Sequence, residues 1–493
     1  MKFRSTRSTS PATVSSAFAI KNGLAPDGGL YMPESIPSLT AEEVKALVAK
    51  EYPERAAYIL GKFLTDYTET ELLEDCRAAY NDTKYHGGIA PLAHVKENLY
   101  SLELWHGPTC AFKDMALQIM PRLLSRALEK TGETRDALIL VATSGDTGKA
   151  ALEGYCDVPR IKIQVFYPQD GVSTVQKLQM QTQKGANVNV TAIYGNFDDA
   201  QTGVKKIFSD PSMTEKLSES NSFFSSANSI NWGRLAPQIA YYVSAYCDLM
   251  AEGKIGYGDP VDFCVPTGNF GNIFAAYIAK KMGLPIRSLI CASNRNNILT
   301  DFLQTGVYDR NRNFYTTMSP SMDILISSNL ERLLYLLAGA EKTALWMKQL
   351  NECGKYEVDA ETLAGIREVF TGYYTDEENT AEMIRDMYKS GYLCDTHTAV
   401  AMGAVTQYAK ECGKDCPIVA VSTASPYKFA ADVYHALTEK RAESDVAALD
   451  ALSAYTKTEI PAPLAGISTR EVRFTNTVRA DEMPTAVLTF AKN

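Results

Sequence analysis

Short apolar runs alternate with helical patterns between Asp136 and Ala292, and this alternation constrains the fold of the 493-residue chain more than any other feature. Ala137–Ala142 is a continuous apolar run, which is typical of a strand covered on both faces. Similar runs occupy Ile161–Phe166, Val188–Ile193, Val261–Val265, Arg287–Cys291 and Ile418–Ser422. Helical patterns separate them at Gly148–Cys156, Val172–Gln183, Asp198–Phe208, Leu235–Met250 and Asn272–Met282. Strands alternating with helices predict parallel βαβ units in an open, doubly wound, mostly parallel α/β sheet.

The sequence is long enough for two or three domains, and its local patterns suggest where they divide. Residues 1–85 include a stretch rich in glycine and proline, Gly23–Pro33, and we expect them to form a mainly helical N-terminal domain. Residues 86–465 are expected to form a central region of two α/β subdomains, and residues 466–493 a peripheral C-terminal tail. Further helical patterns cover Ala41–Ala49, Ala56–Leu64, Leu330–Leu350 and Asp359–Phe370.

Charge and cysteine usage limit the partners and the compartment. A formal net charge of −9 disfavours nucleic acid, because a phosphate backbone is bound by basic surface. The sequence contains no run of roughly 18 apolar residues, so it predicts no membrane-spanning helix. Ten scattered cysteines without a C-x-x-C pair, and only five histidines, indicate a reducing compartment and no metal site. The first ten residues lack the apolar part of a secretory signal, so we expect a cytoplasmic protein, with a mitochondrial presequence as the alternative.

The loop Thr143–Lys149 follows one predicted strand and precedes a helix. Ligands of open α/β sheets bind at the carboxyl ends of strands, and hydroxyls and free amides there suit an anion. Lys149 suggests a nucleotide-binding P-loop, but the motif needs glycine where this chain has Thr143 and a hydroxyl where it has Ala150. The alternative is a plain junction in which Asp146 only caps the helix.

The loop Pro266–Asn272 gives a sharper signal for an anion site. Two glycines and two asparagines within five residues favour a backbone that curls its N–H groups around an anion. The dipole of the following helix adds roughly half a positive charge. The loop does not match G-x-G-x-x-G, so a single phosphate is favoured over a dinucleotide. The alternative is an ordinary Gly/Asn turn.

Lys113 stands on a short turn, after a Gly-Pro pair and an apolar Ala-Phe pair, where a helix is predicted to begin. A semi-enclosed position of this kind lowers the pKa of an ammonium group, and the neutral amine is the form that attacks a carbonyl. Taken alone, Lys113 is more typical of a charged surface residue at a helix start, and the rest of the chain has to decide between the two interpretations.

Two other loops carry weaker signals. Ser422–Pro426 follows the last predicted strand and brings hydroxyls to the same sheet edge, where one can bond a neutral pyridine nitrogen. Ser225–Arg234 is dense in small donors and has one arginine, which suits a second anion through charge-assisted hydrogen bonds. A helix cap with a solvated arginine is the alternative for the second loop.

Together and in this order, these loops resemble the threonine synthases of the longer type, which have an extra N-terminal domain. The resemblance covers most of the chain, and the stretches that carry it are Gly23–Tyr31, His106–Asp114, Thr143–Gly148, Ser226–Asn231 and Val265–Asn272. It implies a fold-type II pyridoxal-phosphate enzyme of the tryptophan-synthase-β-like fold. It also implies the last step of threonine biosynthesis, in which O-phospho-L-homoserine and water give L-threonine and phosphate.

The resemblance assigns expected roles residue by residue. Lys113 is expected to form the Schiff base with the cofactor, Asp146 to lie near its 3-hydroxyl, and Thr423 to face the pyridine nitrogen. The expected ligands of the cofactor phosphate are Gly268, Asn269, Phe270, Gly271 and Asn272. The expected substrate ligands are Ser144 and Thr147 for the carboxylate, and Asn228, Ser229, Asn231 and Arg234 for the phosphate. Two departures, Ser425 in place of histidine in some relatives and the pair Trp232–Gly233, concern the substrate pocket.

Two other functions stay open at this point. A related phospho-lyase would release 2-oxobutyrate from the same substrate, and the sequence barely separates it from a threonine synthase. A non-catalytic relative is disfavoured, because the matched cofactor positions are intact. We expect a small-molecule substrate and a monomer or homodimer.

Overall fold

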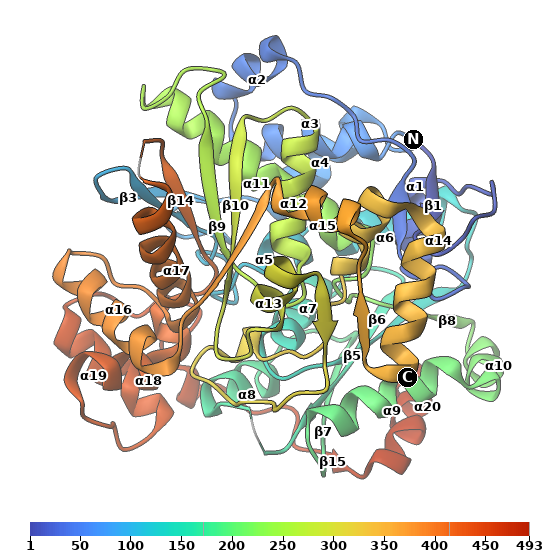
Figure 1. Ribbon diagram of the computed structural model, residues 1–493. Coiled ribbons are helices and arrows are strands. Elements are labelled where there is room, and N and C mark those ends of the chain that lie inside the picture. The colour runs from blue at the N-terminus through green and yellow to red at the C-terminus, as the bar shows by residue number, and fades with distance from the viewer. Residues whose placement is uncertain (171, 414, 493) are drawn as a thin grey trace.

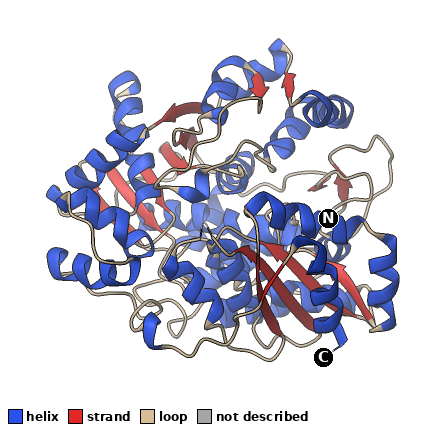
Figure 2. Ribbon diagram, turned by 90° about the horizontal axis from the view of Figure 1, so that it is seen from below, coloured by secondary structure: helices blue, strands red, loops and turns tan. Residues whose placement is uncertain are grey.

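The computed structural model describes residues 1–170, 172–413 and 415–492 and contains two mainly parallel sheets, each enclosed by helices (Figure 1). Viewed from below, the two groups of strands lie apart, with helices around each (Figure 2). This architecture confirms the predicted doubly wound α/β fold.

The larger sheet has the strand order β13-β10-β9-β14-β4-β3 and is parallel except where β3 pairs with β4. Its strands are β3 (Leu92–Lys96), β4 (Leu99–Glu103), β9 (Val261–Pro266), β10 (Ile286–Ser293), β13 (Phe370–Tyr374) and β14 (Ile418–Ser422). Alternate residues of β9 belong to different cores, with Phe263 and Val265 on one face and Cys264 on the other. Burial on both faces explains why these strands are continuous apolar runs in the sequence.

The smaller sheet has the order β15-β7-β6-β5-β8 and is parallel throughout. Its strands are β5 (Asp136–Ala142), β6 (Ile161–Pro168), β7 (Val188–Ile193), β8 (Ser222–Ser225) and β15 (Thr477–Val478). Ile139 and Val141 of β5 join the main core, whereas Leu138 and Leu140 pack beneath α9 and α20 in a separate cluster. Two short strands, β11 (Val307–Asp309) and β12 (Lys355–Glu357), pair with each other outside the two large sheets.

Helices connect and cover the strands. They are α5 (Asp114–Leu117), α6 (Met120–Lys130), α7 (Asp146–Tyr155), α8 (Thr174–Gln181), α9 (Phe197–Ser209), α10 (Pro211–Glu219), α11 (Trp232–Ala251), α12 (Gly271–Lys281), α13 (Ile298–Thr305), α14 (Leu330–Cys353), α15 (Ala360–Arg367), α16 (Glu377–Lys389), α17 (Thr396–Cys412), α18 (Ala430–Thr438), α19 (Asp445–Thr456) and α20 (Met483–Lys492). Among the described helices, none is long and apolar enough to cross a membrane.

The first eighty residues form four helices and one antiparallel strand pair. These elements are β1 (Phe3–Ser5), β2 (Tyr31–Pro33), α1 (Ser16–Asn22), α2 (Ala41–Val48), α3 (Tyr52–Phe63) and α4 (Glu69–Ala79). Capping boxes start α2 at Thr40 and α4 at Thr68. The fully buried ring of Trp232, on α11, contacts the rings of Phe3 and Phe63, with centroids 5.4 and 5.5 Å apart. The N-terminal region therefore shares its core with helix α11, which follows β8 of the smaller sheet.

Residues 466–492 contribute to the smaller sheet as well as to its periphery. Strand β15 pairs with β7 and forms the edge of that sheet. Met483 and Val487 of α20 are buried against Phe166 and Ile193. The segment that we expected to be a peripheral tail thus supplies an edge strand and a helix that covers the smaller sheet.

Some expected elements differ from the observed ones. The helical pattern at Asp359–Phe370 ends at Arg367, and Phe370 begins β13. Strands β4 and β8 were not expected, because β4 mixes polar residues into its pattern and β8 has only four residues. Edge and mixed strands lack the apolar continuity on which the prediction depended.

Candidate active site

Lys113 lies at the point where loops from the two sheets meet. The loop after β4 is joined to the loop after β14, because Phe112 N donates to Thr423 O over 2.8 Å. Within the turn, Thr109 donates from both its N–H and its hydroxyl to the Asp114 carboxylate, each over 2.8 Å. Cys110 has a φ of 59°, a left-handed conformation that these bonds help to hold. The turn aims the Lys113 side chain at the smaller sheet.

The amine of Lys113 is nearly enclosed, with 10% of the side chain exposed. Its Nζ lies 3.3 Å from Asp146 Oδ2 and 3.4 Å from Ser321 Oγ. Burial lowers the pKa of Lys113, Asp146 opposes this effect, and the positive charge of Arg234 adds to it. A lowered pKa raises the fraction of neutral amine, which is the nucleophilic and basic form.

Asp146 begins α7 and lies between two lysines. Its Oδ1 is 3.2 Å from Nζ of Lys428 and accepts a 2.8 Å hydrogen bond from Gln176 Nε2. Lys428 is completely buried and also donates to Thr109 O and to Gln179 Oε1. Burial disfavours the ionised carboxylate, yet the two lysines hold the pKa of Asp146 well below its usual range. Asp146 is therefore a permanent negative charge beside the Lys113 amine.

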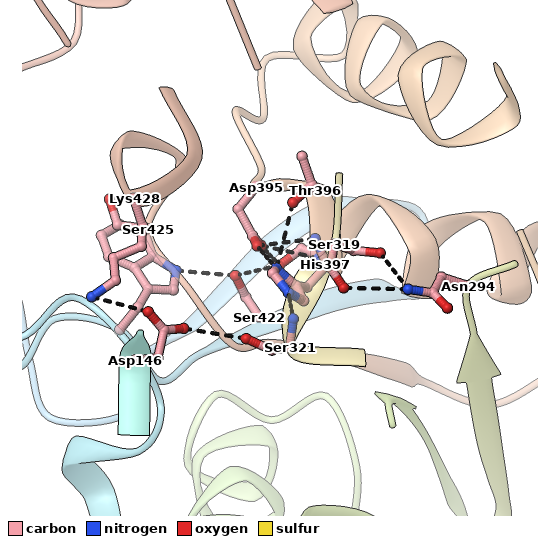
Figure 3. A network of polar contacts seen from close by, with 12 residues as sticks. Asp146, Asn294, Ser319, Ser321, Asp395, Thr396, His397, Ser422, Ser425 and Lys428 are labelled. Carbon is pink, nitrogen blue, oxygen red and sulfur yellow. Dashed lines mark hydrogen bonds and ion pairs between the residues drawn. The ribbon is translucent and has the colours of Figure 1, made fainter. Parts of the chain in front are cut away.

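Figure 3 shows a polar chain that leads from Asp146 towards α17. Ser321 Oγ lies 3.3 Å from Asp146 Oδ2, and Ser321 N donates to His397 Nε2 over 3.1 Å. The other ring nitrogen of His397 is 2.8 Å from Asp395 Oδ2. Asp395 caps α17 by accepting from His397 N and Thr398 N. With Nε2 accepting from Ser321 N, the other ring nitrogen, Nδ1, faces the Asp395 carboxylate.

The loop Pro266–Asn272 has the shape of an anion cradle. No described residue accepts a hydrogen bond from the backbone N–H groups of residues 268–272, at the start of α12. Phe270, with a φ of 62°, turns the chain into the helix. A Cβ on Gly268 would lie 2.7 Å from Ser321 O, so only glycine fits there without displacement. Five unpaired amides at a helix N-terminus are suited to a phosphate.

Two polar groups near this cradle lack partners among the described residues. Asn272 Oδ1 accepts from the hydroxyls of Tyr241 and Tyr242, while its Nδ2 is buried without an acceptor. Thr423 is 6% exposed, and no described side chain or backbone group bonds its hydroxyl. A buried polar atom without a partner, such as Asn272 Nδ2, is uncommon in folded proteins, and here it lies beside the free amides of the cradle.

The residues expected to bind substrate divide into two groups. Arg234 is buried, its guanidinium donates to Ala227 O over 3.0 Å, and no described carboxylate pairs with it. Burial lowers the pKa of Arg234 to about 10. Ser144, exposed, and Thr147, half-buried, flank Asp146 on the same turn. Arg234 affects the Lys113 amine through its charge, and Ser144 and Thr147 lie beside Asp146, the partner of that amine.

The remaining expected substrate ligands have local roles. The Asn231 side chain caps α11 by accepting from Gly233 N, and it donates to Ile20 O and Ser226 O. These three bonds serve the local fold, and the role of Asn231 toward the substrate stays a prediction. Asn228 is exposed, and its Oδ1 accepts from Ser229 N.

Several site residues were not expected from the sequence, namely Lys428, Gln176, Ser321, Asp395 and His397. Lys428 had a detectable signal, because it follows the loop Ser422–Pro426 within an apolar stretch, where an isolated lysine is unusual. Lys149, which had suggested a P-loop, instead pairs with Glu153 at 2.8 Å and with Gln183.

Comparison with known families decides what this arrangement is. A model of the threonine synthase N terminus matches residues 2–80, a model of pyridoxal-phosphate dependent enzymes matches residues 84–424, and a model of the threonine synthase C-terminal part matches residues 398–487. The chain belongs to the threonine synthase family. It is a pyridoxal-phosphate-dependent enzyme of fold type II, as the resemblance of its loops implied.

Relatives of this family match along most of the chain. Threonine synthase of Pseudomonas aeruginosa is 40% identical over 438 residues, covering 87% of this chain and 89% of its own length. Human threonine synthase-like 1 is 42% identical over 436 residues, covering 86% of this chain, which spans 58% of that protein. A structure of PLP-bound threonine synthase from Brucella melitensis has a TM-score of 0.88, with 37% identity and 100% coverage of both chains. The yeast threonine synthase structure has a TM-score of 0.90, with 34% identity and coverage of 99% and 98%.

The cofactor of this family member is pyridoxal phosphate, and the residues present suit it. The free amides of residues 268–272 offer donors to a phosphate, and the unpartnered Asn272 Nδ2 lies at the same helix end. Lys113 offers an amine to the aldehyde, and the Thr423 hydroxyl is available to a ring nitrogen. These groups therefore suit the phosphate, the aldehyde and the ring nitrogen of the cofactor.

Proposed function

We propose that the protein is a threonine synthase that converts O-phospho-L-homoserine and water to L-threonine and phosphate. The observation that carries the proposal is Arg234, a buried guanidinium with no carboxylate partner among the described residues. An unpaired buried cation is costly unless an anion occupies the site when the enzyme works. It lies close enough to Lys113 for its charge to lower the pKa of that amine. The phosphate group of a phosphorylated amino acid supplies the negative charge that would pair with the Arg234 guanidinium.

Within this proposal the residues have distinct tasks. Pyridoxal phosphate, held by residues 268–272, Thr423 and Lys113, supplies the electron sink. The neutral amine of Lys113 moves protons at Cα and Cβ of the substrate, and its lowered pKa supports this role. Asp146 stays ionised and holds the Lys113 Nζ in place.

The substrate is gripped at both ends in this proposal. Ser144 and Thr147, beside the start of α7, bind its carboxylate, because hydroxyls and free amides at a helix N-terminus suit an anion. Arg234 binds the phosphate that leaves from Cγ, with Asn228 and Ser229 at the less buried side. Water then adds at Cβ. A small-molecule substrate, an acidic chain and free cysteines together favour a cytoplasmic location.

The decisive experiment supplies the holoenzyme with O-phospho-L-homoserine in H₂¹⁸O. The proposal predicts L-threonine with one ¹⁸O in its hydroxyl, and phosphate without ¹⁸O, because the Cγ–O bond breaks rather than a P–O bond. Phosphate carrying ¹⁸O would indicate a phosphatase. Equal amounts of 2-oxobutyrate, ammonia and phosphate without threonine would indicate the phospho-lyase instead.

Two variants support that measurement. Lys113→Ala should reduce turnover by at least about 1,000-fold and remove the visible absorbance of the bound cofactor. Lys84→Ala is the matched control, because burial lowers the pKa of Lys84 too, while its side chain bonds Gln118 away from the cradle. Turnover retained in Lys113→Ala would contradict the assigned role.

A further inference from the structure

Two carbonyl groups of the anion cradle accept hydrogen bonds from the segment that precedes α14. Gly268 O accepts a 2.7 Å hydrogen bond from Ser327 Oγ. Asn269 O accepts two bonds from Asn329, one from its backbone N and one from its Nδ2, each 3.0 Å long. A trans peptide is planar, so fixing a carbonyl also fixes the N–H of the next residue in the opposite direction. Ser327 and Asn329 therefore aim the N–H groups of Asn269 and Phe270 into the open side of the cradle.

Asn329 is held in turn by Arg332, one turn along α14. Arg332 NH1 donates to Asn329 Oδ1, which leaves the Asn329 amide nitrogen free to face Asn269 O. Arg332 is fully buried, and its carboxylate neighbour on the helix, Glu331, is taken by Arg7 through bonds of 2.9 and 2.7 Å. A buried arginine with neutral partners only is costly, so a positional task explains it better than stability does.

Arg332 also joins segments that are distant in sequence. Its NH2 donates to Ile230 O over 2.6 Å and to Tyr31 O over 3.3 Å. Ile230 ends the loop that leads into α11, and Tyr31 lies on β2 of the N-terminal region. Through one guanidinium, the cradle, the loop before Arg234 and the N-terminal region are held in one arrangement.

We propose that Asn329 and Arg332 are positioning residues that set the affinity of the enzyme for the phosphate of its cofactor. They do not touch the phosphate themselves; Asn329 orients the peptide groups that do, and Arg332 orients Asn329. This inference rests on the assignment of residues 268–272 to the cofactor phosphate.

The test separates the phosphate from the rest of the cofactor. The full chain, stripped of cofactor, is titrated with pyridoxal phosphate and with pyridoxal, which lacks the phosphate. Asn329→Ala and Arg332→Lys should raise the Kd for pyridoxal phosphate about 10- to 100-fold, which is the effect of losing one or two oriented donors to a charged group. The Kd for pyridoxal should change less than about twofold. Equal losses for both ligands, or no loss for either, would overturn the proposal.

Milder variants guard against a failure to fold. Ser327→Ala removes the single bond to Gly268 O and should raise the Kd for pyridoxal phosphate about 3- to 10-fold, again without affecting pyridoxal. Glu331→Gln is the matched control on the same helical turn, because its side chain faces Thr6 and Arg7 rather than the cradle. It should lower the melting temperature and leave both Kd values unchanged. A phosphate-selective loss in Glu331→Gln would count against a specific role for Asn329 and Arg332.

The wild-type protein tests the assignment of residues 268–272 separately from the positioning role of Asn329 and Arg332. If it binds pyridoxal and pyridoxal phosphate equally, the assignment of residues 268–272 fails, and this inference fails with it. If it prefers pyridoxal phosphate strongly and the Asn329 and Arg332 variants keep that preference, only the positioning role fails.

Discussion

Nζ of Lys428 lies 3.2 Å from Oδ1 of Asp146, and both side chains are buried. The Asp146 carboxylate thus contacts Lys428 through Oδ1 and Lys113 through Oδ2. Because Lys428 also bonds Thr109 O, it connects the start of α7 to the turn that carries Lys113. The separation of the two lysines is thus set by one buried carboxylate.

Removing that cation should affect both stability and catalysis. Among the described residues, Lys428→Met leaves Asp146 paired with Lys113 alone, and breaking a buried pair in this way costs about 3 to 5 kcal/mol. We expect kcat to fall about 100-fold, because the Lys113 amine becomes more firmly protonated and less well placed. Lys149→Met breaks another buried lysine pair on α7, with Glu153, and should lower stability only. Kinetics and thermal melts of the two variants distinguish these outcomes.

Arg234 should control substrate affinity. Arg234→Gln should raise KM for O-phospho-L-homoserine about 10- to 100-fold, the loss expected for a charge-assisted contact to phosphate. The inhibition constant of inorganic phosphate, measured against the same substrate, should rise in parallel. The proposed role is wrong if KM rises while phosphate inhibition stays unchanged.

Gly268 should tolerate no side chain. In Gly268→Ala the new Cβ would lie 2.7 Å from Ser321 O, so either the cradle or the Ser321 segment must move. We expect at least tenfold weaker binding of pyridoxal phosphate, measured by titration of the cofactor-free chain. Gly61→Ala, on α3, meets only Leu72 Cδ1 at 3.6 Å and should leave cofactor binding unchanged.

Asp114 should make the protein less stable as pH rises. Burial raises the pKa of Asp114 to about 7, and the bonds from Thr109 only partly offset this effect. Between the unfolded pKa, near 4, and about 7, the folded state binds more protons than the unfolded state, so stability falls by up to about 1.4 kcal/mol per pH unit. Asp114→Asn should remove this slope from denaturant unfolding measured at several pH values. An identical slope in the variant would show that Asp114 does not titrate in this range.

Contiguous motifs made the fold and the core of the site predictable. Continuous apolar runs marked β5 and β9 because both faces of these strands are buried. The cradle at 268–272 and the turn at Lys113 are each formed by neighbouring residues, so their chemistry is visible in the sequence. Their roles as ligands remain predictions until the binding experiments are done.

Residues brought together only by folding could not be found in this way. Ser321 and His397 belong to segments without a distinctive pattern, and they meet through a backbone N–H. Asn231 shows a second difficulty, because a cluster of small donors suits both an anion and a helix cap. Its side chain caps α11, and its role toward the substrate stays a prediction.

The edge strand β15 has a consequence for how the enzyme is made. Strand β7 gains this neighbour only after the ribosome has synthesised the whole larger sheet, since Thr477 lies far beyond β14 in the sequence. Until then β7 has an unpaired edge, which is a hazard for association with other chains. The smaller sheet therefore receives its last strand late in translation, and a nascent chain paused before β15 would expose the edge of β7 to other chains.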